Sequence, residues 1–255
     1  MGKKLVIGAS GQIGIELIDK LAAQYGIDQV IATDIKLQPD IYAEGVKSQQ
    51  LDVLDKVKLF DIIKANDVSE IYLLAALLSA VSEKKTQSAW DLNMRGLFNV
   101  LELAREKHIQ RVFWPSSIAV FGTSSPLNNT PQRTILEPLT VYGISKMAGE
   151  RWCEYYYEKF NVDVRSLRYP GIISHKSIPG GGTTDYAVNI FYSAIENQKY
   201  RCFLEENIQL PMMFMDDAIR ATMEIMNVER SSLSINSSYN VAAMDFTPKQ
   251  LAKEI

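Results

Sequence analysis

A glycine-rich turn near the start of the chain restricts the possible folds more than any other feature. Gly8, Gly11 and Gly14 have the spacing G-x-x-G-x-x-G, between a β-branched run at 3–7 and a segment whose apolar residues recur at helical spacing. In a strand–turn–helix unit the first glycine permits the tight turn and the second lets a pyrophosphate approach the backbone. The third lets the helix pack on the strand. Because free N–H groups at a helix start favour a diphosphate, the turn predicts a dinucleotide-binding unit.

Strand-like and helix-like segments alternate after this turn. We expect strands at 29–34, 46–51, 70–75, 111–114 and 162–167, and helices at 55–65, 86–107 and 142–160. Strands that alternate with helices of this length form parallel βαβ units, because a parallel connection needs a long crossover. The predicted fold class is therefore α/β, with a Rossmann-type doubly wound parallel sheet.

The alternation is less regular in the second half of the chain. Residues 122–140 combine several prolines with serine, threonine and asparagine, so they are expected to form a loop. Later we expect a glycine turn, two helices and a strand, at 179–182, 185–197, 216–228 and 237–241. We predict a dinucleotide-binding domain at 1–170 and a smaller C-terminal substrate lobe at 171–255, interleaved with the Rossmann sheet.

Composition excludes several classes of function. The chain has 27 Lys plus Arg and 30 Asp plus Glu, for a net charge of -3. A protein that binds nucleic acid mainly through the phosphates needs an excess of basic residues, so this function is not expected. Cys153, Cys202, His108 and His175 show no paired ligand spacing, which leaves no basis for a metal site. Two distant cysteines favour reduced thiols and a cytoplasmic protein. With the longest apolar stretch at 71–81, and a first strand starting at residue 3, neither a membrane span nor a targeting peptide is expected.

Two aspartates follow the expected strands on the dinucleotide side. Asp34 ends the second strand, 20 residues after Gly14. A carboxylate there accepts hydrogen bonds from the adenosine ribose and repels a 2′-phosphate, so it predicts NAD rather than NADP. Asp52 follows the third strand, where it could accept from the adenine amino group or cap a helix that begins at Val53.

A Tyr-x-x-x-Lys pattern marks the candidate reacting centre. Tyr142 and Lys146 lie four residues apart, on one face of the expected helix 142–160. A free phenol has a pKa of about 10, and a nearby ammonium together with a cationic nicotinamide should lower it, making Tyr142 a general base. The same spacing recurs at Tyr155 and Lys159, within an aromatic stripe more typical of a core or a subunit interface.

A serine pair completes this centre. The strand 111–114 leads to Ser116 and Ser117 at the carboxyl edge of the sheet, where ligands of open α/β sheets bind. Ser117 can donate a hydrogen bond to a substrate oxygen that changes between alcohol and carbonyl. Without Tyr142 and Lys146, the pair would indicate only the capping of a strand end.

Together these residues resemble the extended short-chain dehydrogenase/reductase superfamily, in its branch of nucleotide-sugar epimerases and dehydratases. The resemblance covers the chain from residue 3 to 255. The matching features are Gly8, Gly11, Gly14, Asp34, Leu-Asp-Val at 51–53, Asn-Met-Arg-Gly at 93–96, Ser117, Tyr142 and Lys146.

Within that branch the chain is most similar to the NAD-dependent L-threonine 3-dehydrogenases of the short-chain type, through segments 73–80, 115–122, 168–174 and 179–188. The resemblance implies threonine catabolism: oxidation of the β-hydroxyl of L-threonine to 2-amino-3-ketobutyrate, with hydride transfer to NAD and without a metal. Tyr142 would abstract the hydroxyl proton, Ser117 would steady the oxygen, and Lys146 would position the nicotinamide ribose.

The resemblance also assigns binding residues. A helix beginning at 183–185 could bind the substrate carboxylate at its N-terminus, or this segment could be an ordinary cap. Asn93 would help hold Lys146 through water, and Ser79 ends the fourth strand. The substrate residues are Ser79, Ser117, Tyr142, Gly182, Thr183 and Thr184. The cofactor residues are Gly8, Gly11, Gln12, Ile13, Gly14, Asp34, Asp52, Val53, Leu74, Ala75, Ala76, Asn93, Ser116, Tyr142, Lys146, Tyr169, Gly171 and Ile172.

Two alternatives remain open at this point. One is a nucleotide-sugar epimerase or dehydratase with bound NAD, and the other is a non-catalytic NAD-binding regulatory protein. Members of the superfamily commonly pair through helices such as 86–107 and 142–160, so a homodimer is expected. They usually continue beyond a point equivalent to residue 255, so part of the substrate lobe is expected to be missing.

Overall fold

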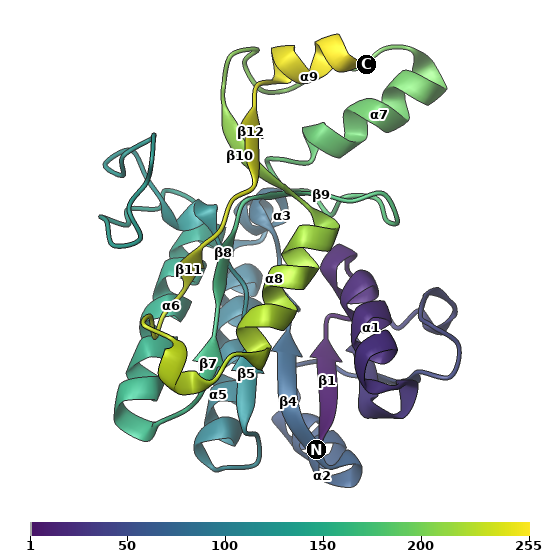
Figure 1. Cartoon of the computed structure of the whole chain (residues 1–255), viewed down its shortest axis with the longest axis vertical. Helices are drawn as coiled ribbons and strands as arrows, with labels where there is room; N and C mark the ends of the chain where they lie inside the picture. Colours follow the sequence, from purple (N-terminus) through teal and green to yellow (C-terminus); the bar gives the residue numbers. More distant parts are fainter. Residues whose placement is uncertain (1) are drawn as a thin grey trace.

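A six-stranded parallel sheet forms the centre of the protein, as a computed structural model of residues 2–255 shows. Its strand order is β3-β2-β1-β4-β5-β7. The chain therefore runs from β1 to one edge, returns to the centre, and continues to the other edge (Figure 1). This order confirms the predicted Rossmann-type doubly wound sheet, and it places the change of direction between β1 and β4. The strands are β1 (Lys3–Ile7), β2 (Val30–Asp34), β3 (Lys47–Gln50), β4 (Val68–Leu73), β5 (Arg111–Phe113) and β7 (Val164–Arg165).

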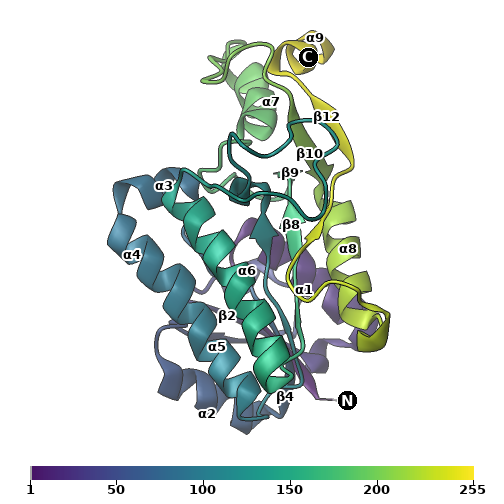
Figure 2. The same cartoon turned by 90° about the vertical axis from the view of Figure 1, so that its left-hand side faces the viewer.

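Helices cover both faces of this sheet. On one face lie α2 (Lys56–Asn66), α5 (Gly96–Arg105) and α6 (Val141–Phe160); on the other lie α1 (Gln12–Tyr25) and α8 (Met215–Asn227) (Figures 1 and 2). Alternate residues of β1 separate the two cores. Leu5 and Ile7 pack with the first group of helices, whereas Val6 packs with the second. Burial on both faces explains why the central strands are continuous apolar runs.

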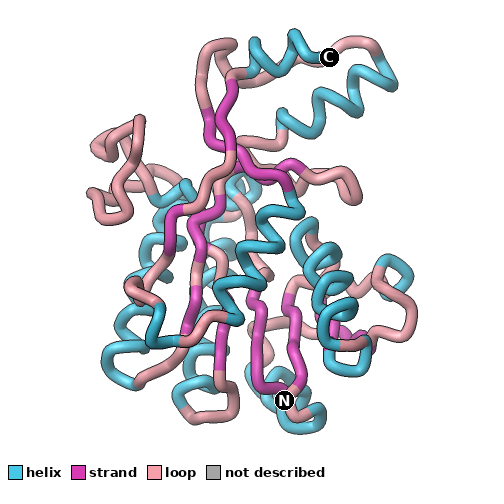
Figure 3. The backbone as a smooth tube through the Cα atoms, viewed as in Figure 1, coloured by secondary structure: helices cyan, strands magenta, loops and turns pink. Residues whose placement is uncertain are grey.

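A smaller lobe stands above the carboxyl edge of the sheet (Figure 3). It contains a three-stranded sheet in the order β12-β10-β9, with two helices beside it. The lobe elements are β9 (Gly171–Ile173), α7 (Tyr186–Asn197), β10 (Leu210–Phe214), β12 (Met244–Phe246) and α9 (Pro248–Glu254). Between β10 and β12 the chain returns to the body, where α8 packs on α1 and β11 (Tyr239–Asn240) pairs with β8 (Leu167–Tyr169). The division at residue 170 stays a prediction.

Two predicted elements are broken in the structure. The helix expected at 86–107 consists of α4 (Thr86–Trp90), a π-helical segment (Asp91–Arg95) and α5. The strand expected at 162–167 divides into β7, in the central sheet, and β8, which pairs with β6 (Ser116–Ser117) and β11 in a separate three-stranded sheet. The division occurs because the chain leaves the central sheet after Arg165 and turns toward the lobe.

Several short elements had no counterpart in the predictions. Strands β9, β10 and β12 have three to five residues each, too few for a clear alternation of apolar and polar side chains. The others are α3 (Ser79–Lys84) and single 3₁₀ turns at Ile27–Gln29, Pro39–Ile41, Ile118–Val120 and Arg230–Ser232.

A buried ion pair joins the helix α6 to the strand β8. Arg168 donates through Nε to Oε1 of Glu150 at 2.8 Å and through Nη2 to Oε2 at 2.7 Å. The hydroxyl of Ser116 donates to Glu150 Oε1 at 2.6 Å. Arg168 Nη1 donates to the carbonyl of Gln132 and to the side chain of Asn240. Because both charges are almost fully buried, these hydrogen bonds fix the relative positions of five segments of the chain.

Within residues 2–255, none of the helices combines the length and apolar character needed to cross a membrane. In the same range no three His, Cys, Asp or Glu side chains are grouped as a metal site would require. Cys153 and Cys202 are both free thiols.

We expect Glu150→Ala to lower the free energy of unfolding by about 3–5 kcal/mol, because it leaves the guanidinium of Arg168 buried without its partner. The measurement is urea denaturation followed by circular dichroism. Glu154→Ala is the matched control, since Glu154 lies on the same helix and pairs with Arg151 at the surface. The control should change the free energy by less than about 1 kcal/mol, and equal effects of the two substitutions would contradict the prediction.

Candidate active site

The three glycines of the first turn have different roles in the structure. Gly8 has φ +90°, and a Cβ there would lie 2.5 Å from the backbone nitrogen of Ala75. A Cβ on Gly14 would lie 2.4 Å from the carbonyl oxygen of Gly8, so this glycine is required by the packing of α1 on the turn. A Cβ on Gly11 would have only the carbonyl of Gly8 near it, at 3.4 Å. The backbone at Gly11 is therefore accessible to a ligand.

The start of α1 suits an anion. Gly11 is the N-cap residue, no side chain caps the helix, and its first turn contains no acidic residue. The positive end of the helix dipole and the first N–H groups are thus available to a diphosphate. The turn and the helix fit the dinucleotide that the sequence predicts.

Asp34 lies beside this turn at the end of β2. Its Oδ2 accepts from the backbone N–H of Ser10 at 3.0 Å, and its Oδ1 accepts from that of Lys36 at 2.9 Å. Each carboxylate oxygen has two acceptor sites, so one on each remains for a ribose hydroxyl. The hydrogen bonds orient the carboxylate before any ligand binds.

Asp52 and Val53 lie further along the same edge. Asp52 Oδ1 accepts from the backbone N–H of Leu54 at 2.9 Å. The alternative role of Asp52 as a helix cap is wrong, because α2 begins at Lys56 and Asp55 is its N-cap. Val53 is a buried core residue whose carbonyl accepts from the side chain of Asn99. The adenine contacts of these two residues stay predictions.

Tyr142 and Lys146 come from the first two turns of α6. Thr140 caps this helix, its hydroxyl accepting from the N–H of Gly143 at 3.0 Å. Lys146 is buried and its Nζ donates to the carbonyl of Pro115 at 2.6 Å. The ammonium lies 4.5 Å from the ring centroid of Trp114 and 5.5 Å from that of Tyr142. The pair is thus held by the start of α6 and by the segment that follows β5.

Burial changes the acidity of both groups. It raises the pKa of the Tyr142 phenol to about 12, against the effect of a hydrogen bond with Ser117. It lowers the pKa of the Lys146 ammonium to about 7. In the protein alone, burial is the main influence on the Tyr142 phenol, and its predicted lowering by Lys146 together with a cationic nicotinamide stays a prediction. A further positive charge is needed to favour the phenolate.

The second Tyr-x-x-x-Lys copy lies elsewhere. Tyr155 is exposed and packs edge-on against Trp152 and Phe160 on the outer face of α6. The aromatic stripe therefore has an exposed side, Trp152 and Tyr155, and a buried member, Tyr156, and none of the three lines the cavity.

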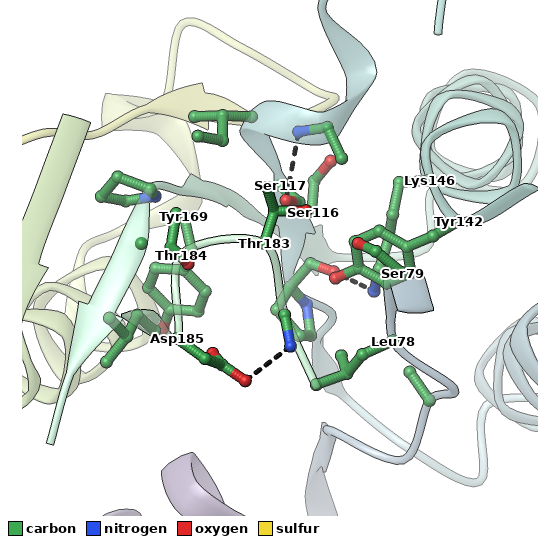
Figure 4. A pocket seen from close by; sticks show the side chains of 18 of the residues that line it. Leu78, Ser79, Ser116, Ser117, Tyr142, Lys146, Tyr169, Thr183, Thr184 and Asp185 are labelled. Atoms are coloured by element: carbon green, nitrogen blue, oxygen red, sulfur yellow. Dashed lines mark hydrogen bonds between the residues drawn. The ribbon is translucent and has the colours of Figure 1, made fainter. Parts of the chain in front are cut away.

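A cavity of about 300 Å³ lies between the body and the lobe. Figure 4 shows Tyr142 and Lys146 beside Ser79 on one side of it, with Tyr169 and Thr184 on the other. The predicted site residues that line it are Gln12, Ile13, Leu74, Ala76, Ser79, Ser116, Ser117, Tyr142, Lys146, Tyr169, Gly171, Ile172, Gly182, Thr183 and Thr184. The predicted residues outside its lining are Gly8, Gly11, Gly14, Asp34, Asp52, Val53, Ala75 and Asn93.

The lining also includes residues that the sequence analysis missed. They are Leu78, Pro115, Ile118, Ala119, Pro170, Asp185 and Leu210. Five of them are adjacent in the sequence to a predicted site residue, and Ala119 is two residues from Ser117, so closeness in the sequence could have identified all but Leu210. Leu210 begins β10 in the lobe, and no local signal connects it with the glycine turn.

Asn93 holds the segment that leads to Ser79. Its Oδ1 accepts from the N–H of Leu77 at 2.9 Å, and its Nδ2 donates to the Leu77 carbonyl and to the hydroxyl of Ser145, each at 3.2 Å. The π-helical segment directs this side chain inward. Asn93 is therefore joined to α6 through Ser145, the residue before Lys146, and its contact with Lys146 through water stays a prediction.

Ser79 does not end the fourth strand, as predicted, but begins the short helix α3. The difference arises because β4 ends at Leu73 and an irregular stretch crosses the edge of the sheet before α3. The N–H of Ala80 donates to the carbonyl of Gly181 at 3.3 Å. Ser79 is thereby held against the glycine turn of the lobe.

Asp185 orders the substrate segment of the lobe. It is the N-cap of α7, which begins at Tyr186, and its Oδ2 accepts from the N–H groups of Gly181 and Gly182 at 2.8 and 2.6 Å. Partial burial raises the pKa of this carboxyl. The turn that carries residues 182–184 is thus fixed by hydrogen bonds to Asp185, the N-cap of the helix that follows it, and these residues line the cavity.

The chain was compared with known proteins. Residues 4–242 match the model of the NAD dependent epimerase/dehydratase family. An uncharacterised epimerase/dehydratase of Staphylococcus aureus is 44% identical over 256 residues, which cover all of this chain and 79% of that protein.

Two solved structures are also similar. A GalE-like L-threonine dehydrogenase from Cupriavidus necator, in its holo form, is 52% identical with a TM-score of 0.95, covering 98% of this chain and 81% of that one. A monomeric L-threonine 3-dehydrogenase from a metagenome is 47% identical with a TM-score of 0.94, covering 98% and 80%. The family match extends over nearly the whole sequence, and it includes the glycine turn and the Tyr142–Lys146 pair. The chain belongs to the NAD-dependent epimerase/dehydratase family.

Proposed function

We propose that the protein oxidises the β-hydroxyl of L-threonine to 2-amino-3-ketobutyrate, with NAD as hydride acceptor. One observation carries the proposal: Tyr142, Lys146 and Ser117 share a cavity with residues 182–184 of the lobe, in a chain about half identical to L-threonine dehydrogenases. The intact Tyr–Lys pair favours an enzyme over a non-catalytic NAD-binding protein. The similarity to threonine dehydrogenases favours this reaction over that of a nucleotide-sugar epimerase.

The residues around the cavity supply the parts of this reaction. NAD, when bound, takes the hydride from the β-carbon and brings a positive charge to the nicotinamide. The phenol oxygen of Tyr142 accepts the hydroxyl proton as the carbonyl forms, and the Ser117 hydroxyl donates to the same substrate oxygen. Lys146, whose Nζ donates to the carbonyl of Pro115, would hold the ribose hydroxyls on the nicotinamide side of the cofactor. Because the pKa of Tyr142 is raised by burial, the cationic cofactor is what makes the phenolate accessible.

The lining of the cavity offers polar groups to a small amino acid. Its charged side chains are Lys146 and Asp185, one of each sign. We assign the amino acid to Ser79 of the body and residues 182–184 of the lobe, which lie close together at the cavity. Gln12, Ile13, Tyr169, Gly171 and Ile172 are assigned to the cofactor.

Further properties belong to the same proposal. We place the protein in the cytoplasm, which the two free thiols Cys153 and Cys202 support. We propose a homodimer through α4, α5 and α6, because Trp90, Trp152 and Tyr155 are exposed large side chains on these helices.

Tyr142→Phe should reduce NADH formation with L-threonine by about 10²–10⁴-fold, because the substrate hydroxyl loses its proton acceptor. The affinity for NAD, measured by calorimetry, should stay close to that of the unaltered protein. Tyr155→Phe is the matched control, with the same Tyr-x-x-x-Lys spacing outside the cavity, and it should retain full activity. A fully active Tyr142→Phe protein would refute the assignment. Parallel assays with L-serine and nucleotide sugars separate the proposed reaction from epimerase chemistry.

The protein should bind NAD more tightly than NADP, and Asp34→Ala should weaken NAD binding by about 10–100-fold, because hydrogen bonds to a charged acceptor are lost. The same substitution should reduce the difference in affinity between NAD and NADP, because the carboxylate that repels the 2′-phosphate is no longer present. Titration calorimetry with each cofactor measures both effects. Asp40→Ala, in the loop after β2, serves as control. A preference for NADP in the unaltered protein would contradict the role given to Asp34.

Light scattering at micromolar concentration should give the mass of a dimer, and Trp152→Glu should shift it to that of a monomer. The reason is that a carboxylate on an apolar interface costs free energy when the interface is buried. Phe203→Glu, an exposed aromatic in the lobe, is the control and should leave the mass unchanged. A monomeric unaltered protein would contradict the proposed interface.

A further inference from the structure

A short segment of the chain connects the cofactor helix with the substrate turn. After β9, residues 174–176 lie against α1, and the chain then continues to the turn that presents residues 182–184. The side chain of Gln12 donates to the hydroxyl of Ser174 at 3.2 Å. The ammonium of Lys176 donates to Oδ2 of Asp19, also at 3.2 Å. We name residues 174–176 the strap.

The strap lies along one face of α1. Gln12, Glu16 and Asp19 are spaced four and three residues apart, which places their side chains in a row along the helix. Gln12 stands at the cavity, because it is part of the lining, and Asp19 is nearly two turns away from it. The strap therefore spans the distance between the ligand end of α1 and its middle.

Glu16, in the centre of this row, has an unusual environment. The residue is 4% exposed, and its Oε1 is buried without a hydrogen-bond partner in the structure of residues 2–255. The charged groups that influence it are Lys176 and His175 of the strap, Asp216 at the start of α8, and Asp19. Burial raises the pKa of this carboxyl. A buried carboxyl oxygen without a partner is costly, so its retention needs an explanation.

The contact that Lys176 makes with Asp19 is a weak one. The side chains of Lys176 and Asp19 are 43% and 35% exposed, and a solvent-exposed ion pair contributes little stability. A pair with Glu16 would be shielded from water and would satisfy the orphan oxygen. Glu16 and Asp19 are three residues apart, so moving the ammonium from Asp19 to Glu16 carries it about 4.5 Å along α1 toward the cavity and draws the strap in the same direction.

We propose that Glu16 is a second binding position for Lys176, occupied when NAD and substrate are bound, and that this shift of the strap brings residues 182–184 over the substrate. Glu16 is then a positioning residue, which acts on the substrate through the strap without touching the reacting atoms. The inference rests on the proposed function, since it concerns the closure of the same site. Figure 1 shows the loop between β9 and α7 above α1, where such a movement would occur.

The test uses steady-state kinetics of three variants of the full chain with L-threonine and NAD. Glu16→Gln should raise the KM for L-threonine about ten- to hundredfold, because closure over the substrate is lost, while kcat and the Kd for NAD change little. Lys176→Met should have the same effect. The double variant Glu16→Gln/Lys176→Met should be no worse than either single one, since both remove one interaction.

Asp19→Asn is the matched control and distinguishes this proposal from a merely structural role. It removes the position that Lys176 occupies in the ligand-free protein, so the KM for L-threonine should stay unchanged or fall. A Glu16→Gln variant with an unchanged KM, or a larger increase in KM for Asp19→Asn, would overturn the inference. NADH formation by the unaltered protein is measured first. Its absence would count against the proposed function, and hydrogen exchange of residues 177–183 with and without NAD would then test the strap alone.

Discussion

The buried pair of Glu150 and Arg168 determines the geometry of the cavity more than any other interaction. Glu150 belongs to the helix that carries Tyr142 and Lys146, and it accepts from Ser116, the neighbour of Ser117. Arg168 precedes the residues of β8 and β9 that line the opposite wall. Because two buried charges must keep their hydrogen bonds, the base, the serine and the cofactor wall cannot move independently. Glu150 and Arg168 therefore fix the positions of the residues that line the cavity, although neither residue lines it.

Local patterns were enough to predict the body of the fold. The glycine turn, the apolar strands and the helices between them each depend on near neighbours in the sequence, and they appear where expected except that the helix at 86–107 and the strand at 162–167 are divided. The lobe strands β9, β10 and β12 could not be predicted, because they are short and their pairing joins segments far apart in the sequence. The π-helical segment at Asp91–Arg95 was missed for a related reason, since it depends on the contacts that Asn93 makes with Leu77 and Ser145.

The residues of the candidate site could be predicted from the sequence better than their pKa values. The motifs and the family resemblance together identified fifteen of the residues that line the cavity, because most of them follow strands at the carboxyl edge of the sheet. For Tyr142, the spacing indicated a nearby amine but gave no sign that burial raises the pKa of the phenol in the protein alone. Spacing along a helix shows that an amine is near a phenol, but it does not show how much water both have lost. The solvation of a group depends on the whole fold, which no short motif describes.

The path of the chain through the two parts has a consequence for how such a protein can change. The chain enters the lobe after β8, returns to the body as α8 and β11, and enters the lobe again at β12. The lobe is therefore not a contiguous fragment that recombination could exchange as a unit. New substrate preferences on this scaffold are more accessible through replacements of individual residues around the cavity. The same connections join the lobe to the body at three places, after β8, before α8 and before β12.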